Sequence, residues 1–84
     1  MNTFTFTVST PQESAQYTVQ SVFLRGAEGD FAVLAGHIPF ITSVQPGKCR
    51  VLTQDGEKSA YTDGGLLTVG KEETIFLTGN FTWE

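Results

Sequence analysis

Cysteine and histidine are nearly absent from this 84-residue sequence, which contains one of each, Cys49 and His37. A lone cysteine cannot form an internal disulfide. One cysteine and one histidine in the whole chain also argue against a zinc site and against a cysteine–histidine catalytic pair. Cys49 alternates with Val51 in an apolar stretch, so we interpret it as a small core residue rather than a nucleophile. We therefore expect no enzymatic activity, no metal and no cofactor.

Basic residues are also scarce, with five Lys and Arg against nine Asp and Glu and a net charge of −4. They are dispersed along the chain, so we expect no binding to the phosphate backbone of a nucleic acid. No apolar run approaches the roughly 18 to 20 residues that span a bilayer, and the N-terminus lacks the basic and apolar regions of a signal peptide. We expect a protein of the reducing cytosol, with no direct membrane insertion, that meets a membrane only through a partner.

The sequence does contain many short apolar stretches separated by turns. Hydrophobic residues make up 39% of the chain, which is enough for the core of one small domain, so residues 1–84 are assigned to a single domain. Residues 3–9 alternate between apolar and polar, which predicts a strand, and residues 17–25 predict a second one. Because no stretch shows a useful helical repeat, we predict an all-β fold, a flattened antiparallel β-sandwich of about ten short strands.

Turn-forming residues punctuate these stretches. Asp55-Gly56 predicts a type I′ hairpin between residues 49–53 and 58–62. Gly64-Gly65 adjoins an apolar strand, which is typical of a bulge or a close backbone approach. The residues assigned to structural turns are Gly26, Gly36, Gly47, Asp55, Gly56, Gly64 and Gly65.

Residues 25–42, RGAEGDFAVLAGHIPFIT, gather three glycines, two acidic residues and His37 between apolar runs. The GAEG segment lacks the flanking helices and basic field of a nucleic-acid GXXG loop, and Glu28 and Asp30 would repel a phosphate. The acidic turn is either a solvated surface turn or an electrostatic contact with a partner. His37 either bonds to local backbone or contacts a partner.

Two longer segments, GAEGDFAVLAGHIPFITSVQPGKCRVL and DGGLLTVGKEETIFLTG, resemble the N-terminal β-sandwich of the epsilon subunit of rotary ATP synthase. The first follows the family pattern G-x-E-G-[ED], a short apolar run, P-G-H-x-P-hydrophobic-hydrophobic-T and x-P-G, and the second follows S-G-G-hydrophobic-hydrophobic-x-V. Ala35 stands where the family usually has proline, and Asp63 where it has serine. The resemblance covers essentially the whole chain, and its matching positions are Gly26, Glu28, Gly29, Asp30, Gly36, His37, Pro39, Phe40, Ile41, Thr42, Pro46, Gly47, Gly64, Gly65, Leu66, Leu67 and Val69.

This resemblance implies a noncatalytic subunit of the central rotor, which joins the gamma shaft to the membrane c-ring and so couples ion translocation to ATP synthesis. Such a subunit meets the catalytic head only indirectly and lies peripherally on the cytoplasmic side of the bacterial inner membrane. The implied gamma contacts are His37, Phe40, Ile41 and Thr42, and the implied c-ring contacts are Glu28, Gly29 and Asp30. One of Phe40 and Ile41 is expected in the core, and alternation alone does not decide which.

Members of this family ordinarily continue after the last strand into a helical hairpin that can restrain ATP hydrolysis and, in some members, binds ATP. Because the sequence ends at Glu84, we expect a short form without micromolar ATP binding or nucleotide-dependent inhibition, unless the natural chain is longer. The alternative function is a free-standing β-sandwich that binds a small ligand, or a peptide strand at an open edge.

Overall fold

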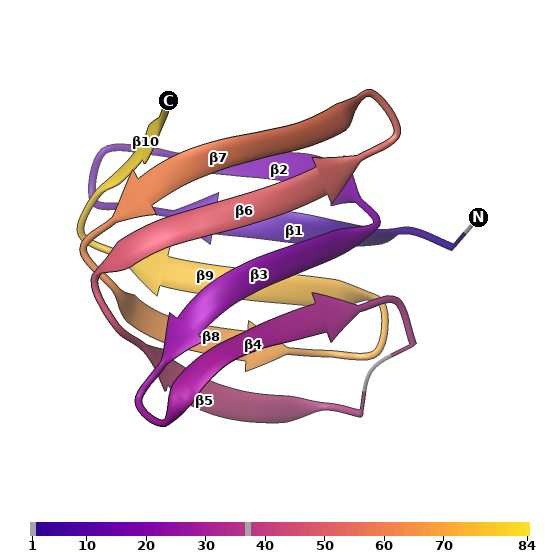
Figure 1. Ribbon diagram of the computed structural model, residues 1–84, viewed down its shortest axis with the longest axis horizontal. Helices are drawn as coiled ribbons and strands as arrows, with labels where there is room; N and C mark the ends of the chain where they lie inside the picture. The colour runs from indigo at the N-terminus through magenta and orange to yellow at the C-terminus, as the bar shows by residue number, and fades with distance from the viewer. Residues whose placement is uncertain (1, 37) are drawn as a thin grey trace.

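The computed structural model describes residues 2–36 and 38–84, and within these ranges the chain forms ten β-strands and no helix. Five strands form sheet A, in the order β2-β1-β9-β8-β5, and five form sheet B, in the order β10-β7-β6-β3-β4 (Figure 1). The predicted all-β sandwich of about ten short strands is confirmed. The strands are β1 (Phe4–Ser9), β2 (Ser14–Val19), β3 (Ser21–Gly26), β4 (Gly29–Leu34), β5 (Phe40–Val44), β6 (Gly47–Thr53), β7 (Gly56–Thr62), β8 (Gly65–Val69), β9 (Glu73–Thr78) and β10 (Phe81–Trp83).

The pairing of β1 with β9 joins β1 and β2 to the other three strands of sheet A. These strands run parallel, with Thr5 opposite Glu73 and Ser9 opposite Leu77, whereas the other described pairs are antiparallel. Thr7 Oγ1 also donates a hydrogen bond to Glu73 Oε2 at 2.9 Å. Since a parallel pair cannot be joined by a tight hairpin, sheet A is complete only when the two ends of the chain come together.

Residues 14–26 form two strands in different sheets, so the single strand predicted over residues 17–25 is wrong. The chain bends at Gln20, whose N–H donates to the Leu52 carbonyl at 2.7 Å, and β2 then pairs in sheet A while β3 pairs in sheet B. Val19 and Val22 are both fully buried, although they are three positions apart. When the chain crosses to the facing sheet, the side of the strand that faces the core is reversed. The alternation of buried and exposed residues therefore shifts by one position between β2 and β3.

The β6–β7 hairpin has the predicted partners but not the predicted turn. Thr53 lies opposite Gly56, so the loop residues are Gln54 and Asp55. No described residue other than glycine has a positive φ, which excludes a type I′ turn at these positions. Instead, the Thr53 hydroxyl accepts a hydrogen bond from Asp55 N–H at 3.1 Å and donates one to the Gly56 carbonyl at 3.0 Å.

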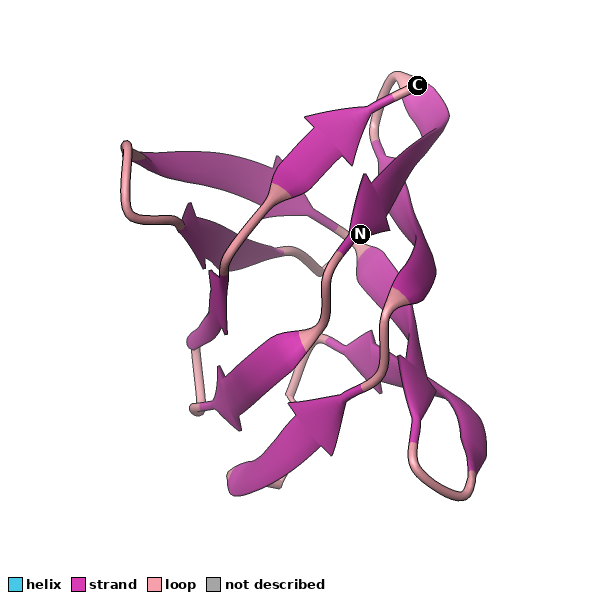
Figure 2. Ribbon diagram, turned by 90° about the vertical axis from the view of Figure 1, so that its left-hand side faces the viewer, coloured by secondary structure: helices cyan, strands magenta, loops and turns pink. Residues whose placement is uncertain are grey.

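The core lies between the two sheets, which face each other as separate layers in Figure 2. Inward side chains from both sheets are fully buried, and the predicted inward set of β1 is among the buried residues. Aromatic rings close the side where β2 and β10 meet, with Trp83 edge-on to Tyr17 at 5.3 Å and its Nε1 donating to Tyr17 Oη at 3.2 Å. The largest fully buried side chains are Phe6, Phe76, Leu24, Leu67, Val19, Val22, Val33 and Val51.

Cys49 belongs to this core. It faces inward from β6 opposite Ala60, and neither residue is exposed to solvent. Loss of hydration disfavours the thiolate, and burial raises the pKa of the Cys49 thiol to about 12. The interpretation of Cys49 as a core residue is confirmed.

Gly47 and Gly65 have similar backbone angles but different surroundings. Their φ values are +149° and +154°, a region that L-residues rarely adopt. A Cβ on Gly47 would meet the flexible Arg25 side chain, with Nη1 at 3.7 Å, whereas a Cβ on Gly65 would collide with the Leu77 carbonyl on β9. Gly65 therefore allows β8 and β9 to approach each other.

Alanine substitution of these two glycines distinguishes the cost of backbone strain from the cost of a steric collision. Gly47→Ala should lower the free energy of unfolding by about 1 to 3 kcal/mol, the usual cost of such an angle. Gly65→Ala should cost roughly 2 kcal/mol more, because overpacking against a backbone atom is added to the same strain. Urea denaturation of both variants measures the difference, and equal losses would show that the β8–β9 approach is not tight.

The buried thiol also predicts a pH dependence of stability. The unfolded thiol ionises near its ordinary pKa of 9.0 and the folded one near 12, so the folded state keeps a proton that the unfolded state loses. The free energy of unfolding should therefore fall between about pH 9 and 12, by up to about 1.4 kcal/mol per pH unit. Denaturation of the wild type and Cys49→Ala across this range tests it, since the variant should show a shallower fall; identical slopes would contradict the assignment.

Candidate interaction surfaces

The residues predicted to contact the c-ring lie at the turn between β3 and β4, and the described residues predicted to contact gamma lie on β5. The turn between β3 and β4 is at one end of the molecule and the start of β5 is at the other (Figure 1). His37, which precedes β5 in the sequence, lies outside the described residues. The structure therefore places the acidic turn and the start of β5 at opposite ends and does not gather them into one site.

The acidic turn projects its carboxylates into solvent. Gly26 lies opposite Gly29, and both Glu28 and Asp30 are exposed. The Asp30 carboxylate is 3.7 Å from Arg25 Nε, whereas Glu28 makes no ion pair with any of the described residues. Glu28 is therefore the carboxylate of this turn that is most available to a cationic partner.

Thr42 is, among the described residues, the predicted gamma contact that borders this turn. It borders, together with residues 26–31, an open hollow of about 340 Å³. Thr42 is half-buried, and its hydroxyl donates to the Ser43 carbonyl at 3.4 Å. The hollow thus links β5 of sheet A to the turn of sheet B.

The structure decides which of Phe40 and Ile41 faces the core. The Phe40 ring is half-buried and lies edge-on to Phe31, with their centroids 6.4 Å apart. Ile41, the next residue, points to the outer face of sheet A and is 66% exposed. Phe40 can therefore support the surface from within, and Ile41 can contact a partner directly.

Ile41 is part of a larger apolar surface that we call the sheet A face, formed by outward residues of β5, β8 and β9. Ile41 lies opposite Thr68, which lies opposite Ile75, and in the adjacent row Leu66 lies opposite Leu77. Leu66 and Leu77 are 44% and 46% exposed. Five residues thus define a continuous, largely apolar surface on three neighbouring strands: Ile41, Leu66, Thr68, Ile75 and Leu77.

Sequence reasoning missed Leu66, Ile75 and Leu77 as contact candidates. The signal was present, because adjacent residues in a strand face opposite ways and β8 contains Leu66-Leu67 while β9 contains Ile75-Phe76-Leu77. Leu67 and Phe76 are fully buried, so their apolar neighbours must face solvent or a partner. Contiguous apolar surface of this kind commonly marks an interaction site.

Neither a metal-binding cluster nor a membrane-spanning helix is found among the described residues. Residues 2–36 and 38–84 contain no group of three or more His, Cys, Asp or Glu side chains that could hold a metal ion. The same ranges contain no helix of the length and apolarity that crossing a membrane requires. The features that stand out are therefore surfaces: the sheet A face and the acidic turn.

Comparison with known sequences identifies relatives over nearly the whole chain. Residues 3–84 match the family described as "ATP synthase, Delta/Epsilon chain, beta-sandwich domain". The sodium-ion-specific ATP synthase epsilon chain of Propionigenium modestum is 33% identical over 78 residues, covering 92% of this chain and 57% of the relative. The ATP synthase epsilon chain of Clostridium perfringens strain SM101 is 34% identical over 85 residues, covering 99% of this chain and 64% of the relative. The chain thus spans less than two thirds of the length of these relatives.

Two solved structures share the fold. One chain in the Euglena gracilis mitochondrial ATP synthase structure, described as OSCP/F1/c-ring, matches with a TM-score of 0.89 and 24% identity, over 96% of this chain and 53% of that one. One chain in the Tetrahymena thermophila structure, described as central stalk/c-ring, matches with a TM-score of 0.79 and 10% identity, over 95% of this chain and 66% of that one. At these identities the likeness establishes the β-sandwich alone.

Proposed function

The chain belongs to the delta/epsilon-chain β-sandwich family of ATP synthase, and from this membership we propose that it is a noncatalytic subunit of the enzyme's central stalk. In this role it joins the gamma shaft to the membrane c-ring and transmits rotation between them. It meets the catalytic head only indirectly and lies at the cytoplasmic face of the membrane through its partners.

The sheet A face is the observation that carries this proposal. A subunit that rotates with a shaft needs a stable interface, and stable interfaces have an apolar core with few charged residues. Ile41, Leu66 and Leu77 are exposed, and the three strands of the face contain a single charged residue, Glu73 at the start of β9. We assign gamma to this face, with Ile41 as a direct contact and Phe40 and Thr42 as residues that support it.

The c-ring is assigned to the acidic turn. Glu28 and Asp30 lie at one end of the sandwich, whereas the sheet A face is one of its broad sides (Figure 1). The two surfaces can therefore be occupied at the same time, as a joint between two partners requires. Exposed carboxylates act mainly through long-range attraction and register, which suits contact with polar loops at the membrane surface.

Charge substitutions on the two broad sides test the gamma assignment. Ile41→Asp should weaken binding to the gamma subunit by about 2 kcal/mol, or roughly 30-fold in Kd, because it places a carboxylate in an apolar contact. Leu34→Asp is the matched control, since Leu34 is 53% exposed but lies on β4 of sheet B. Calorimetry with purified gamma measures both variants. If Ile41→Asp binds like Leu34→Asp, or if the wild type does not bind gamma, a free-standing binding module becomes the better account.

Reversing the charge of the acidic turn tests the c-ring assignment. Assembly of the wild type with the c-ring should slow as ionic strength rises, and Glu28→Lys should abolish or invert this dependence, because salt screens exposed charges over about 10 Å at 0.1 M. Asp55→Lys makes the same charge change in the β6–β7 turn, which is at the other end of the molecule (Figure 1), and should behave like the wild type. Association rates over a series of NaCl concentrations measure the effect; matching salt dependence in all three proteins would remove the acidic turn from the interface.

A further inference from the structure

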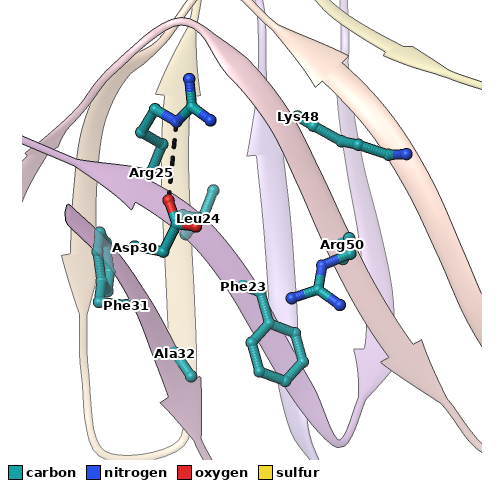
Figure 3. A pocket seen from close by; sticks show the side chains of 8 residues that line it. All are labelled: Phe23, Leu24, Arg25, Asp30, Phe31, Ala32, Lys48 and Arg50. Atoms are coloured by element: carbon teal, nitrogen blue, oxygen red, sulfur yellow. Dashed lines mark ion pairs between the residues drawn. The ribbon is translucent and has the colours of Figure 1, made fainter.

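A hollow on the outer face of sheet B gathers three of the basic residues of an acidic protein. The chain has five Lys and Arg residues, and three of them, Arg25, Lys48 and Arg50, lie on the neighbouring strands β3 and β6. They border one hollow of about 350 Å³ (Figure 3). The same hollow contains a single carboxylate, Asp30, so its lining is net positive although the chain carries a net charge of −4.

The cations occupy defined positions around an aromatic ring. Phe23 lies opposite Arg50, and the Arg50 guanidinium carbon is 4.8 Å from the centre of the Phe23 ring. Stacking of this kind holds a guanidinium in place while leaving its N–H groups directed outward. Arg25, on β3, lies across the hollow from Arg50, whereas Lys48 comes from β6, the strand that also carries Arg50 (Figure 3). Arginine beside an aromatic residue is also a common composition of energetically important interface contacts.

The carboxylates of this face are arranged around the cations. Asp30 is on the edge strand β4, Glu57 is on β7, and Glu84 follows β10. Lys48 Nζ is 3.3 Å from Glu84 Oε1, whereas the Arg25–Asp30 and Arg50–Glu57 pairs are 3.7 and 3.8 Å long, with all four of their side chains about half exposed or more. The two arginine pairs are longer than direct hydrogen bonds, and exposed pairs of this kind contribute little. An incoming carboxylate can therefore replace them.

We propose that this hollow docks an acidic segment of a partner protein, with one or two Asp or Glu side chains bound by Arg25 and Arg50. The surrounding carboxylates favour a narrow segment over a broad anionic surface, because a membrane or nucleic acid approaching the whole face would meet Asp30, Glu57 and Glu84 as well. The guanidinium groups provide the forked donors that match a carboxylate. This site lies on the other side of the sandwich from the sheet A face, so it goes beyond the proposed function and does not depend on it.

A peptide titration tests the proposal. Adding an acetylated and amidated hexaglutamate peptide to the ¹⁵N-labelled chain at low salt should shift amide resonances on β3, β4 and β6 and leave sheet A unchanged. Arg50→Gln should weaken this binding by about tenfold, because it removes a charge-assisted pair. Lys71→Gln is the matched control, since it makes the same change in net charge between β8 and β9 and should bind like the wild type. Equal unfolding midpoints for the two variants establish that both are folded.

Three results would overturn the proposal. Equal weakening by Arg50→Gln and Lys71→Gln would mean that the peptide responds only to net charge. Inorganic phosphate shifting the same resonances at lower concentrations than the peptide would indicate a small-anion site instead. Weaker binding of gamma to Arg50→Gln would place the hollow within the shaft interface, whereas failure of the gamma assignment alone would leave the peptide result unchanged.

Discussion

The alternation of side chains along paired strands is the constraint on which the structure depends. In a two-layer sandwich each residue of a strand faces either the space between the sheets or one of two outer faces, and a domain of 84 residues must fill its core from the inward set. Phe6, Leu67 and Phe76 fill it without exposure. Ile41, Leu66 and Leu77 lie beside such positions but face outward. Packing of the core therefore does not explain why these residues are apolar, whereas contact with a partner can.

The two outer faces differ in chemistry because their strands differ in sequence. On sheet A, β5 and β8 have no charged residue, and the outward residues are mostly Ile, Leu and Thr. On sheet B, β3 and β6 place Arg25, Lys48 and Arg50 outward. The acidic turn adds a third kind of surface at one end. One small domain thereby presents an apolar face and two charged surfaces, which suit partners of different chemistry.

Much of this fold follows from the sequence, and the exceptions have physical causes. Alternation identifies β1 correctly, and Asp55-Gly56 marks a real hairpin, because both signals are local. The crossing at Gln20 depends on a hydrogen bond to Leu52 on β6, and the turn type depends on the Thr53 hydroxyl; neither partner is distinguished by local pattern. The β1–β9 pairing joins distant segments, so no local signal predicts it.

For the candidate site, the resemblance indicates individual residues, and the structure shows which of them share one surface. The resemblance points to Ile41, whereas only the registers of β5, β8 and β9 show that Leu66 and Leu77 lie on the same surface. The choice between Phe40 and Ile41 also required the sheet, because the Phe40 ring is placed by its contact with Phe31 on β4. Sequence patterns identify the amphipathic strands, and tertiary pairing determines which of their residues form one surface.

The central claim is that the gamma shaft binds the sheet A face, and methyl NMR spectroscopy tests it most directly. The chain would be labelled at Ile and Leu methyl groups and titrated with unlabelled gamma subunit. The account predicts that the signals of Ile41, Leu66, Ile75 and Leu77 shift or broaden, while those of Leu34 and Leu52 on sheet B keep their positions. Perturbation confined to Leu34 and Leu52, with the sheet A signals unchanged, would contradict it.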